Sequence, residues 1–255
     1  MADSSYHRLL AEFRKRDNYA VVFRSALEDV AGKVDFSHVE SCVAFGTASG
    51  EREIEFARRL LPNLRSFTAV EPDPESVTAL RTSVLDGRLP GVETSVDEAL
   101  IESWRGVDSR FDAVLLINVL GHVTANDRTA LFQKLMTRYL NDAGRVVICD
   151  NITSVPSGYP QLMKQLGTPL HDYDEIEEEM LAAGFRVVFK QDLEVRRDLS
   201  DPSDDIIKFF KLLTGRVESE VRAAIDDVYS RPNMHVSMRK LAIFTKYTQL
   251  GLLTQ

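Results

Sequence analysis

The sequence predicts an α/β protein in which a mostly parallel sheet carries helices on both faces. The main observation is that short apolar segments alternate along the chain with longer segments whose apolar residues recur at helical spacing. A second observation is Phe111–Asn118 (FDAVLLIN), a continuous apolar strand of the kind that parallel sheets bury on both faces. A third is Gly46, which forms a tight turn between an apolar strand and the start of a helical segment.

The first half of the chain supplies most of this alternation. Residues 5–31 are expected to be helical, because apolar residues from Leu9 to Val30 recur at helical spacing. Strands are then expected at Ser41–Gly46, Ser66–Glu71, Val92–Val96 and Phe111–Asn118, and helices at Glu51–Leu61, from Pro74 to about Leu85 and at about Asn126–Leu140. The Asn-Asp-Ala-Gly turn at 141–144 ends the last of these helices.

The second half continues the alternation and then interrupts it. After a strand at Arg145–Asp150 and a Pro, Gly and Ser segment over 151–160, we expect helices at Tyr159–Leu166 and Tyr173–Ala183 and strands at Phe185–Gln191 and Lys240–Thr245. Residues 198–231 are mostly helical. We therefore expect one domain over 1–255, divided into an N-terminal helical lid (1–40), a Rossmann-like core (41–197), a helical insertion (198–239), and the last strand and tail (240–255).

Composition limits the class of protein and its partners. The chain has 44% hydrophobic and 27% charged residues, which is typical of a soluble globular protein. Its net charge of −8, without a cluster of Lys and Arg, argues against a nucleic-acid partner. The first residues are polar and no apolar run approaches the ~18 residues of a membrane span, so we expect a cytoplasmic protein without a membrane partner. The low aromatic content of 8% favours a monomer.

Cysteine and histidine offer no sign of disulfide or metal chemistry. Cys42 and Cys149 both lie in expected strands, which favours buried reduced thiols over a disulfide. The five histidines are scattered without paired spacing, so no metal site is expected.

Two strand ends point to a ligand that contains a ribose. Gly46 and Gly50, in the turn Gly46-Thr47-Ala48-Ser49-Gly50, let the backbone approach a ligand, and the following helix offers free N–H groups. Glu71, followed by Pro72, ends the next strand about 20 residues later, where a carboxylate is placed to accept both ribose hydroxyls. Alternatively, the turn is an ordinary αβ connection and Glu71 is a solvent-facing carboxylate.

The same turn favours S-adenosylmethionine over a dinucleotide. Dinucleotide sites usually carry G-x-G-x-x-G, because a pyrophosphate sits against the helix N-terminus. Here Ala48 stands in place of the second Gly, and Glu51 puts a negative charge where a pyrophosphate would be repelled. An acidic first turn suits a cofactor that has no phosphate and carries an ammonium and a sulfonium. Alternatively, Glu51 only complements the helix dipole.

The order of expected elements is that of the seven-stranded class I methyltransferases, with a small helical insertion that covers the substrate. Further motifs are the helix Tyr19-x-x-x-Phe23-Arg24-x-x-Leu27, AVEP at 69–72, LLIN at 115–118, YPQLMKQLG at 159–167, DLSD at 198–201 and DIIKFF at 205–210. On these motifs the chain resembles the histamine N-methyltransferase family over nearly its whole length. The DLSD block with its helical insert is the most specific part, because generic methyltransferases lack it.

The resemblance implies a set of cofactor-binding residues. These are Gly46, Thr47, Ala48, Gly50, Glu51, Glu71, Pro72, Ser76, Ser95, Asp97, Ile117 and Asn118. Ser76 is alternatively a surface serine, and Ser95 or Asp97 alternatively caps a helix.

The acceptor half departs from the family pattern. Asn118 stands where the family has Gln, and His122 falls where it has an aromatic residue. Tyr159 and Met163 match two tryptophans of the family, and Arg239 falls near the asparagine that holds the reacting nitrogen. The resemblance therefore does not extend to histamine as the acceptor.

Asn118 and His122 are the expected catalytic residues. Loops at such strand ends form the ligand crevice of open α/β sheets, and an amide there can orient an amine lone pair. His122 is a candidate proton acceptor. Alternatively, Asn118 caps the next turn and His122 is a packing residue.

Five further side chains complete the expected acceptor site around Asn118 and His122. Tyr19 and Phe23 lie one helical turn apart and either close over a sulfonium or belong to the core. Tyr159 and Met163 are expected to line the pocket. Arg239 either lines it too, where a guanidinium favours a carboxylate substrate, or faces solvent at the start of a strand.

These features predict an S-adenosylmethionine-dependent methyltransferase that acts on a nitrogen of a small amine or imidazole metabolite. Two alternatives keep the fold. One is transfer to an oxygen, either a hydroxyl or a carboxylate held by Arg239. The other is a non-catalytic binding protein with a methyltransferase fold.

Overall fold

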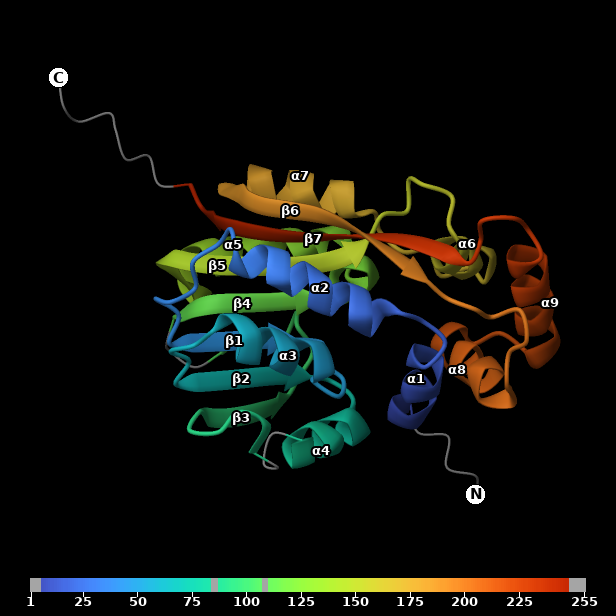
Figure 1. Ribbon diagram of the computed structural model, residues 1–255, viewed down its shortest axis with the longest axis horizontal. Coiled ribbons are helices and arrows are strands. Elements are labelled where there is room, and N and C mark those ends of the chain that lie inside the picture. The colour runs from blue at the N-terminus through green and yellow to red at the C-terminus, as the bar shows by residue number, and fades with distance from the viewer. Residues whose placement is uncertain (1–5, 84–86, 107–109, 248–255) are drawn as a thin grey trace.

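A sheet forms the centre of the computed structural model, which describes residues 6–83, 87–106 and 110–247 (Figure 1). Within these residues the sheet has seven strands in the order β3-β2-β1-β4-β5-β7-β6. The strands are β1 (Ser41–Phe45), β2 (Ser66–Glu71), β3 (Glu93–Glu98), β4 (Phe111–Ile117), β5 (Leu140–Asn151), β6 (Phe185–Arg196) and β7 (Val236–Lys246). Strands β1 to β5 are parallel, and β7 runs antiparallel to β5 and β6. The predicted fold class is confirmed.

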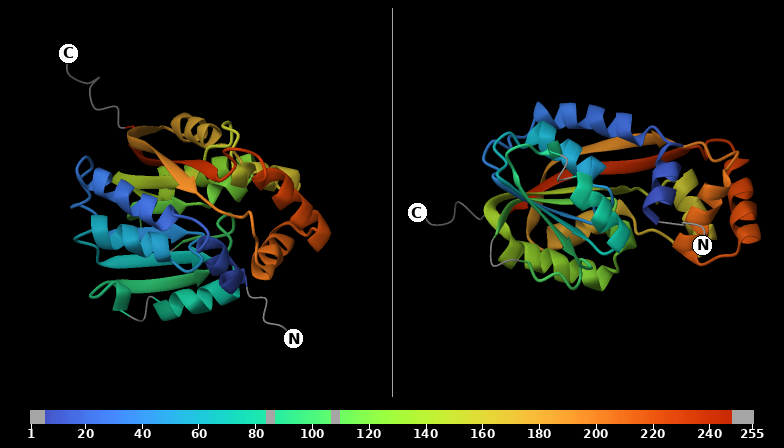
Figure 2. Two further views of the ribbon diagram at one scale, coloured as in Figure 1. Left: turned by 45° about the vertical axis from the view of Figure 1, so that its right-hand side comes forward. Right: turned by 90° about the horizontal axis from the view of Figure 1, so that it is seen from below.

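Helices cover both faces of the sheet, as Figure 2 shows. They are α1 (Tyr6–Arg14), α2 (Tyr19–Ala31), α3 (Glu51–Leu60), α4 (Pro74–Ser83), α5 (Ala125–Lys134), α6 (Gly158–Gln165), α7 (Tyr173–Ala182), α8 (Asp204–Thr214) and α9 (Glu218–Tyr229). Strand β1 shows how the faces divide, because successive side chains point to opposite sides. Cys42 and Ala44 pack with α2 and α3, whereas Val43 and Phe45 pack with α5 and α7.

A third apolar core lies beyond one end of the sheet, at the right of Figure 1. It joins α1, α6, α8 and α9, with Phe13 of α1 stacked on Phe209 of α8 at a ring-centroid distance of 4.8 Å. Helices α8 and α9 form the connection between β6 and β7. Helix α1, near the start of the chain, and the α8–α9 connection therefore pack together in one cover over the carboxyl ends of the parallel strands.

Several element boundaries differ from those expected. The helix expected over 5–31 is two helices, because Asp17 leaves the helical path, accepts from the Tyr19 backbone N–H at 3.1 Å and pairs with Arg197. The expected turn at 141–144 lies inside β5, and a π-helix (Leu135–Tyr139) follows α5. The expected end of a helix near Leu85, residue 5, and the tail after 247 lie outside the described residues.

The thiols of Cys42 and Cys149 are both free and buried, as the sequence predicted. Among the residues that the structure describes, no helix has the length and apolar character needed to cross a membrane.

Candidate functional site

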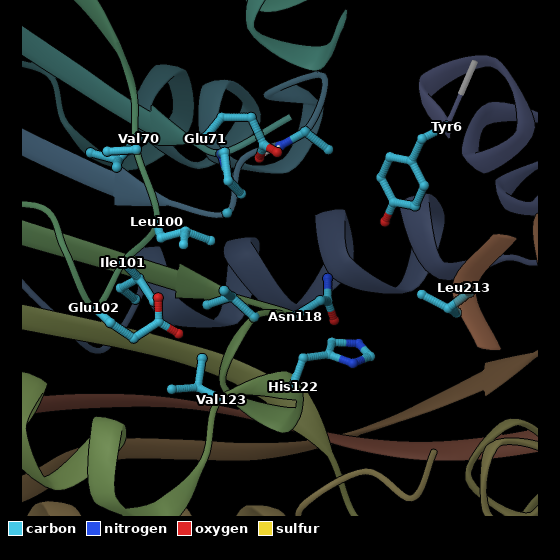
Figure 3. Close-up of a pocket in the computed structure, with 15 residues that line it drawn as sticks. Tyr6, Val70, Glu71, Leu100, Ile101, Glu102, Asn118, His122, Val123 and Leu213 are labelled. Carbon is cyan, nitrogen blue, oxygen red and sulfur yellow. Dashed lines mark hydrogen bonds between the residues drawn. The ribbon is translucent and has the colours of Figure 1, made fainter. Parts of the chain in front are cut away.

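A cavity of about 340 Å³ lies at the carboxyl ends of β1, β2 and β4, and we call it the outer cavity (Figure 3). Its volume falls in the range of pockets that bind small molecules, which is roughly 300–1,000 Å³. Leu100, Ile101 and Glu102 lie on one side of it, and Tyr6 and Leu213 lie on the other. A crevice at this edge of an open α/β sheet is the usual ligand site of such folds.

The glycine turn after β1 forms one wall of the outer cavity. Gly46 has φ +61°, and a Cβ placed there would lie 2.6 Å from the Val119 side chain, so no other residue fits without displacing the wall. Gly50 has φ +70° and precedes the first turn of α3. Glu51 begins that helix as an exposed side chain, 3.7 Å from the Arg14 guanidinium. The turn therefore presents backbone, rather than side chains, to the cavity.

Glu71 stands at the tip of β2 and lines the outer cavity. Its carboxylate accepts hydrogen bonds from the backbone N–H groups of Ala48, at 2.7 Å, and of Asp73, at 3.1 Å. Burial raises the pKa of Glu71, and the two hydrogen bonds oppose that rise. The carboxylate thus couples the tip of β2 to the glycine turn, and it is not the solvent-facing group of the alternative interpretation.

Of the remaining residues predicted to bind the cofactor, some line a cavity and others are buried. Pro72 lines the outer cavity, and Ile117 lines the smaller cavity described below. Thr47 and Ser76 are buried, and neither hydroxyl has a hydrogen-bond partner among the described residues.

Ser95 and Asp97 lie outside the lining of both cavities. The Ser95 hydroxyl donates to Thr68 at 3.0 Å, and Asp97 accepts from the Trp104 indole at 2.9 Å. The wall after β3 is instead made by residues 99–102, which the sequence analysis missed. Their position directly after an expected strand end was the available signal.

A second cavity of about 110 Å³ adjoins the first, and we call it the inner cavity. The two cavities share Tyr6, Gly46, Ala48, Asn118, His122 and Leu213. Tyr19, Tyr159 and Arg239, three of the candidates for an acceptor site, also line the inner cavity, so Arg239 does not face solvent. Phe23 and Met163 are buried in the apolar cores and line neither cavity.

Asn118 lies at the junction of the two cavities in a left-handed backbone conformation with φ +59°. Its side-chain N–H donates to the Tyr19 hydroxyl at 3.2 Å, and its side-chain oxygen accepts from Arg239. The Tyr19 hydroxyl also lies 3.2 Å from the Cys149 sulfur, and burial raises the pKa of Tyr19 well above its ordinary value. The Asn118 amide is therefore held in one orientation by the neutral Tyr19 hydroxyl and the cationic Arg239 guanidinium.

His122 lies on a short 3₁₀ turn (Leu120–His122) that is held from several sides. The Gly121 N–H donates to Asp150 at 3.0 Å, and the Gly121 carbonyl accepts from the His171 backbone N–H at 3.1 Å. Burial lowers the pKa of His122, which the nearby Asp150 carboxylate only partly offsets. The imidazole is therefore neutral at physiological pH.

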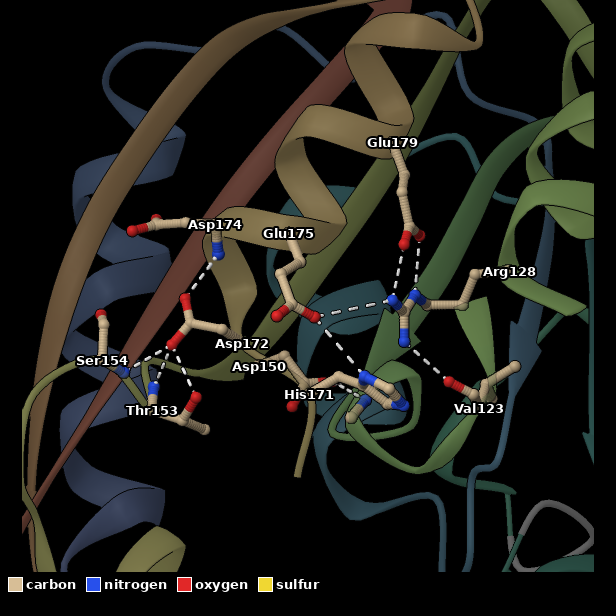
Figure 4. Close-up of polar contacts among 11 residues, drawn as sticks. Val123, Arg128, Asp150, Thr153, Ser154, His171, Asp172, Asp174, Glu175 and Glu179 are labelled. Carbon is tan, nitrogen blue, oxygen red and sulfur yellow. Dashed lines mark hydrogen bonds and ion pairs between the residues drawn. The ribbon is translucent and has the colours of Figure 1, made fainter. Parts of the chain in front are cut away.

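A buried ion pair anchors the residue after this turn, as Figure 4 shows. Arg128 of α5 donates to the Val123 carbonyl at 2.7 Å and makes two hydrogen bonds, of 2.7 and 2.6 Å, to Glu179 of α7. Nearby, Asp172 caps α7 and accepts from Thr153 and from the Ser154 N–H. These contacts tie the His122 turn to two helices behind the sheet.

The inner cavity also contains charged residues that the sequence analysis missed. Arg197 and Asp17 form an ion pair whose side chains are each 2% exposed. Arg14 also lines this cavity and donates to the Ser49 hydroxyl at 3.1 Å. Arg197 directly precedes the DLSD motif, which was the one signal available in the sequence.

Within the part of the chain that the structure describes, no group of three or more His, Cys, Asp or Glu side chains could hold a metal ion.

Comparison with known proteins gives similarity at the level of the fold. No family model matches the sequence, and no curated protein matches it. A candidate methyltransferase from Bacillus halodurans C-125 has a TM-score of 0.63 and 15% identity, over 88% of this chain and 99% of that chain. Geranyl diphosphate C-methyltransferase from Streptomyces coelicolor A3(2) has a TM-score of 0.57 and 14% identity, over 92% and 82%.

The chain has the class I methyltransferase fold. A third similar structure shows what this fold leaves open, because it is the [4+2]-cyclase SpnF, with a TM-score of 0.58 and 15% identity over 88% of this chain and 81% of that chain. Function must therefore be argued from the site itself. These matches support the class I fold and not the narrower resemblance to histamine N-methyltransferases.

Proposed function

We propose that the protein is an S-adenosylmethionine-dependent methyltransferase and that the acceptor atom is a nitrogen of a small metabolite. The observation that carries this proposal is that two cavities meet at Asn118 and His122. The outer cavity has the volume, the Glu71 carboxylate and the glycine turn that suit a nucleoside cofactor. The inner cavity suits a small acceptor.

The lining of the outer cavity fits the nucleoside part of S-adenosylmethionine. Glu71 suits the ribose hydroxyls, and the apolar side chains of Leu100 and Ile101 suit an adenine ring. The similar C-methyltransferase was solved with S-adenosyl-L-homocysteine, the demethylated form of this cofactor. When bound, S-adenosylmethionine supplies an electrophilic methyl group on a sulfonium.

The residues at the junction align the acceptor and keep water out. Methyl transfer is an in-line displacement, so most of the rate enhancement comes from holding the nucleophile in the attack position. Asn118 has one side-chain N–H and one oxygen lone pair beyond its two observed hydrogen bonds, and these can orient an amine or imidazole nitrogen. His122 and Tyr159 bound the acceptor on other sides.

Binding of S-adenosylhomocysteine tests the cofactor assignment. We expect micromolar binding to the wild type and about a 100-fold weaker affinity for Glu71→Ala, because each charge-assisted hydrogen bond to a hydroxyl contributes roughly 1.5–3 kcal/mol. Isothermal calorimetry measures both affinities. Glu75→Ala is the matched control, since Glu75 is exposed on the next helix and lines neither cavity. Absence of binding to the wild type would contradict the proposal, and binding without transfer to any acceptor would favour a non-catalytic role.

A second candidate is transfer to an oxygen, and the neutral His122 imidazole favours it. A hydroxyl must lose its proton during transfer and needs a base, whereas an imidazole acceptor bound in its neutral form attacks with a free lone pair.

Replacement of His122 by Asn separates the two acceptors. For a nitrogen acceptor we expect kcat to fall by less than about tenfold, and for a hydroxyl acceptor by roughly 10²–10⁴-fold. In the hydroxyl case the wild-type rate also falls as pH drops through the lowered His122 pKa, because the protonated imidazole no longer accepts a proton, and the variant lacks this dependence. Single-turnover rates of the wild type and the His122→Asn variant, measured across pH 5–8, distinguish the two acceptors.

A further inference from the structure

Arg239 is a buried cation without an ion-pair partner among the described residues. The residue is 5% exposed, and among the described residues no carboxylate lies within ion-pair distance of its guanidinium. Its Nη1 donates to the neutral amide of Asn118, and its Nε has no hydrogen-bond partner. Two other buried arginines behave differently, because Arg128 pairs with Glu179 and Arg197 pairs with Asp17. An uncompensated buried charge is unfavourable, so it indicates a group whose partner is a ligand.

The guanidinium is directed into the inner cavity. Arg239 lies on β7 opposite Asn151 of β5 and Leu193 of β6, at the carboxyl end of β5. The charged side chains that line the same cavity are Arg14, Asp17, Arg197 and Arg239, which are three cations and one carboxylate. The carboxylate of Asp150 is already used by the Gly121 N–H and by Asn151. The inner cavity therefore carries an excess of positive charge.

Three aromatic rings that line the inner cavity have a guanidinium group over one face. Arg239 stacks on Tyr19 at 4.7 Å from the ring centroid. Arg197 stacks on Phe13 at 4.2 Å and on Tyr159 at 4.9 Å. Faces that would otherwise attract a cationic amine are thus occupied by cations. A substrate with a net positive charge would be repelled at this site.

We propose that the acceptor molecule carries a carboxylate, which Arg239 binds. This inference rests on the proposed function and specifies its substrate class, a small molecule with both a carboxylate and a nucleophilic nitrogen. A planar guanidinium matches a carboxylate with two parallel N–H donors. The inner cavity is smaller than the ~150 Å³ space that holds a benzene molecule, so the acid is a small one.

Calorimetry with matched acid and amide probes tests the proposal. Acetate and propionate are titrated against the corresponding amides, with and without saturating S-adenosylhomocysteine. For the wild type we expect at least one acid to bind 10-fold or more tightly than its amide. Arg239→Gln should abolish that preference while its S-adenosylhomocysteine affinity stays within about threefold of wild type, and Arg239→Lys should retain part of the preference. The Gln variant keeps a donor for Asn118, and its melting temperature reports whether it folds.

Arg52→Gln is the matched control variant. Arg52 stacks on the same Tyr19 ring, at 5.2 Å, but lines neither cavity, so its loss should leave the acid preference unchanged. Two results would overturn the proposal. One is a wild type that prefers no acid. The other is an Arg239→Gln variant that loses S-adenosylhomocysteine binding and keeps the acid preference, which would assign the guanidinium to the cofactor. Acid binding without any S-adenosylhomocysteine binding would instead contradict the proposed function, and Arg239 would then be a carboxylate-binding residue in a protein with another role.

Discussion

Replacement of Arg128 by methionine is expected to lower the free energy of unfolding by about 3–5 kcal/mol. The Arg128 side chain is 1% exposed and carries three hydrogen bonds, two to Glu179 and one to the Val123 carbonyl. Methionine fills much of the volume but leaves a mostly buried carboxylate and a backbone carbonyl without partners. Urea denaturation at neutral pH measures the loss. The position of the His122 side chain should change as well, because Val123 directly follows the His122 turn.

A double variant and a surface control make this prediction specific. Adding Glu179→Leu to Arg128→Met removes the stranded carboxylate and should restore a large part of the lost stability. Arg222→Met, which breaks ion pairs of an exposed arginine with Asp204 and Glu218, should change the stability far less than Arg128→Met does. A loss below 1 kcal/mol for Arg128→Met would show that the buried pair contributes little to the fold.

Replacement of Glu53 by glutamine is expected to raise the free energy of unfolding by about 3 kcal/mol at pH 8. Glu53 is 3% exposed in the first turn of α3, its Oε2 has no hydrogen-bond partner, and burial raises its pKa from 4.5 to about 7. The folded protein therefore keeps a proton that the unfolded chain releases above pH 4.5. Wild-type stability should fall as pH rises from about 4.5 to 7 and then level off. Glutamine cannot ionise, so the variant should lack that decline.

Glu55 on the same helix provides the opposite control. It is partly exposed, and bonds to Arg59 and Arg24 lower its pKa, so Glu55→Gln should slightly reduce stability at pH 8. Urea titrations of the three proteins between pH 4 and 8 give the comparison. If Glu53→Gln proves less stable than wild type at pH 8, then Arg14 and Arg52 hold Glu53 as a stabilised carboxylate.

The fold could be predicted from local sequence where strands are central and parallel. The strand Ser66–Glu71 has the predicted limits, and Ser41–Phe45 and Phe111–Ile117 end one residue before the predicted ends. Such strands are buried on both faces, so their apolar runs mark them directly. Strands β6 and β7 were both predicted too short. Their antiparallel pairing extends to Arg196 and Val236, and these residues are separated in the chain by helices α8 and α9, so no local pattern marks this part of the two strands.

The lining of the two cavities was predicted only where it follows from the order of the strands. Glu71 ends β2, and Gly46 and Asn118 directly follow β1 and β4, so topology alone brings the three residues to one edge of the sheet. Tyr6 and Leu213 come from segments about 200 residues apart in the chain, and no local pattern links them. Phe23 and Met163 have the same helical spacing whether they face a cavity or a core, and the structure places both in the cores.

The packing of α1 on α8 has a consequence for biosynthesis. Gly46, Asn118 and His122, which line both cavities, leave the ribosome well before Leu213 of α8 and Arg239 of β7. Helix α1 is made early, but its contacts with α8 form only after residues 204–214 have been synthesised. Both cavities are therefore completed late in synthesis, and the selection of an acceptor that we propose for the inner cavity depends on β7.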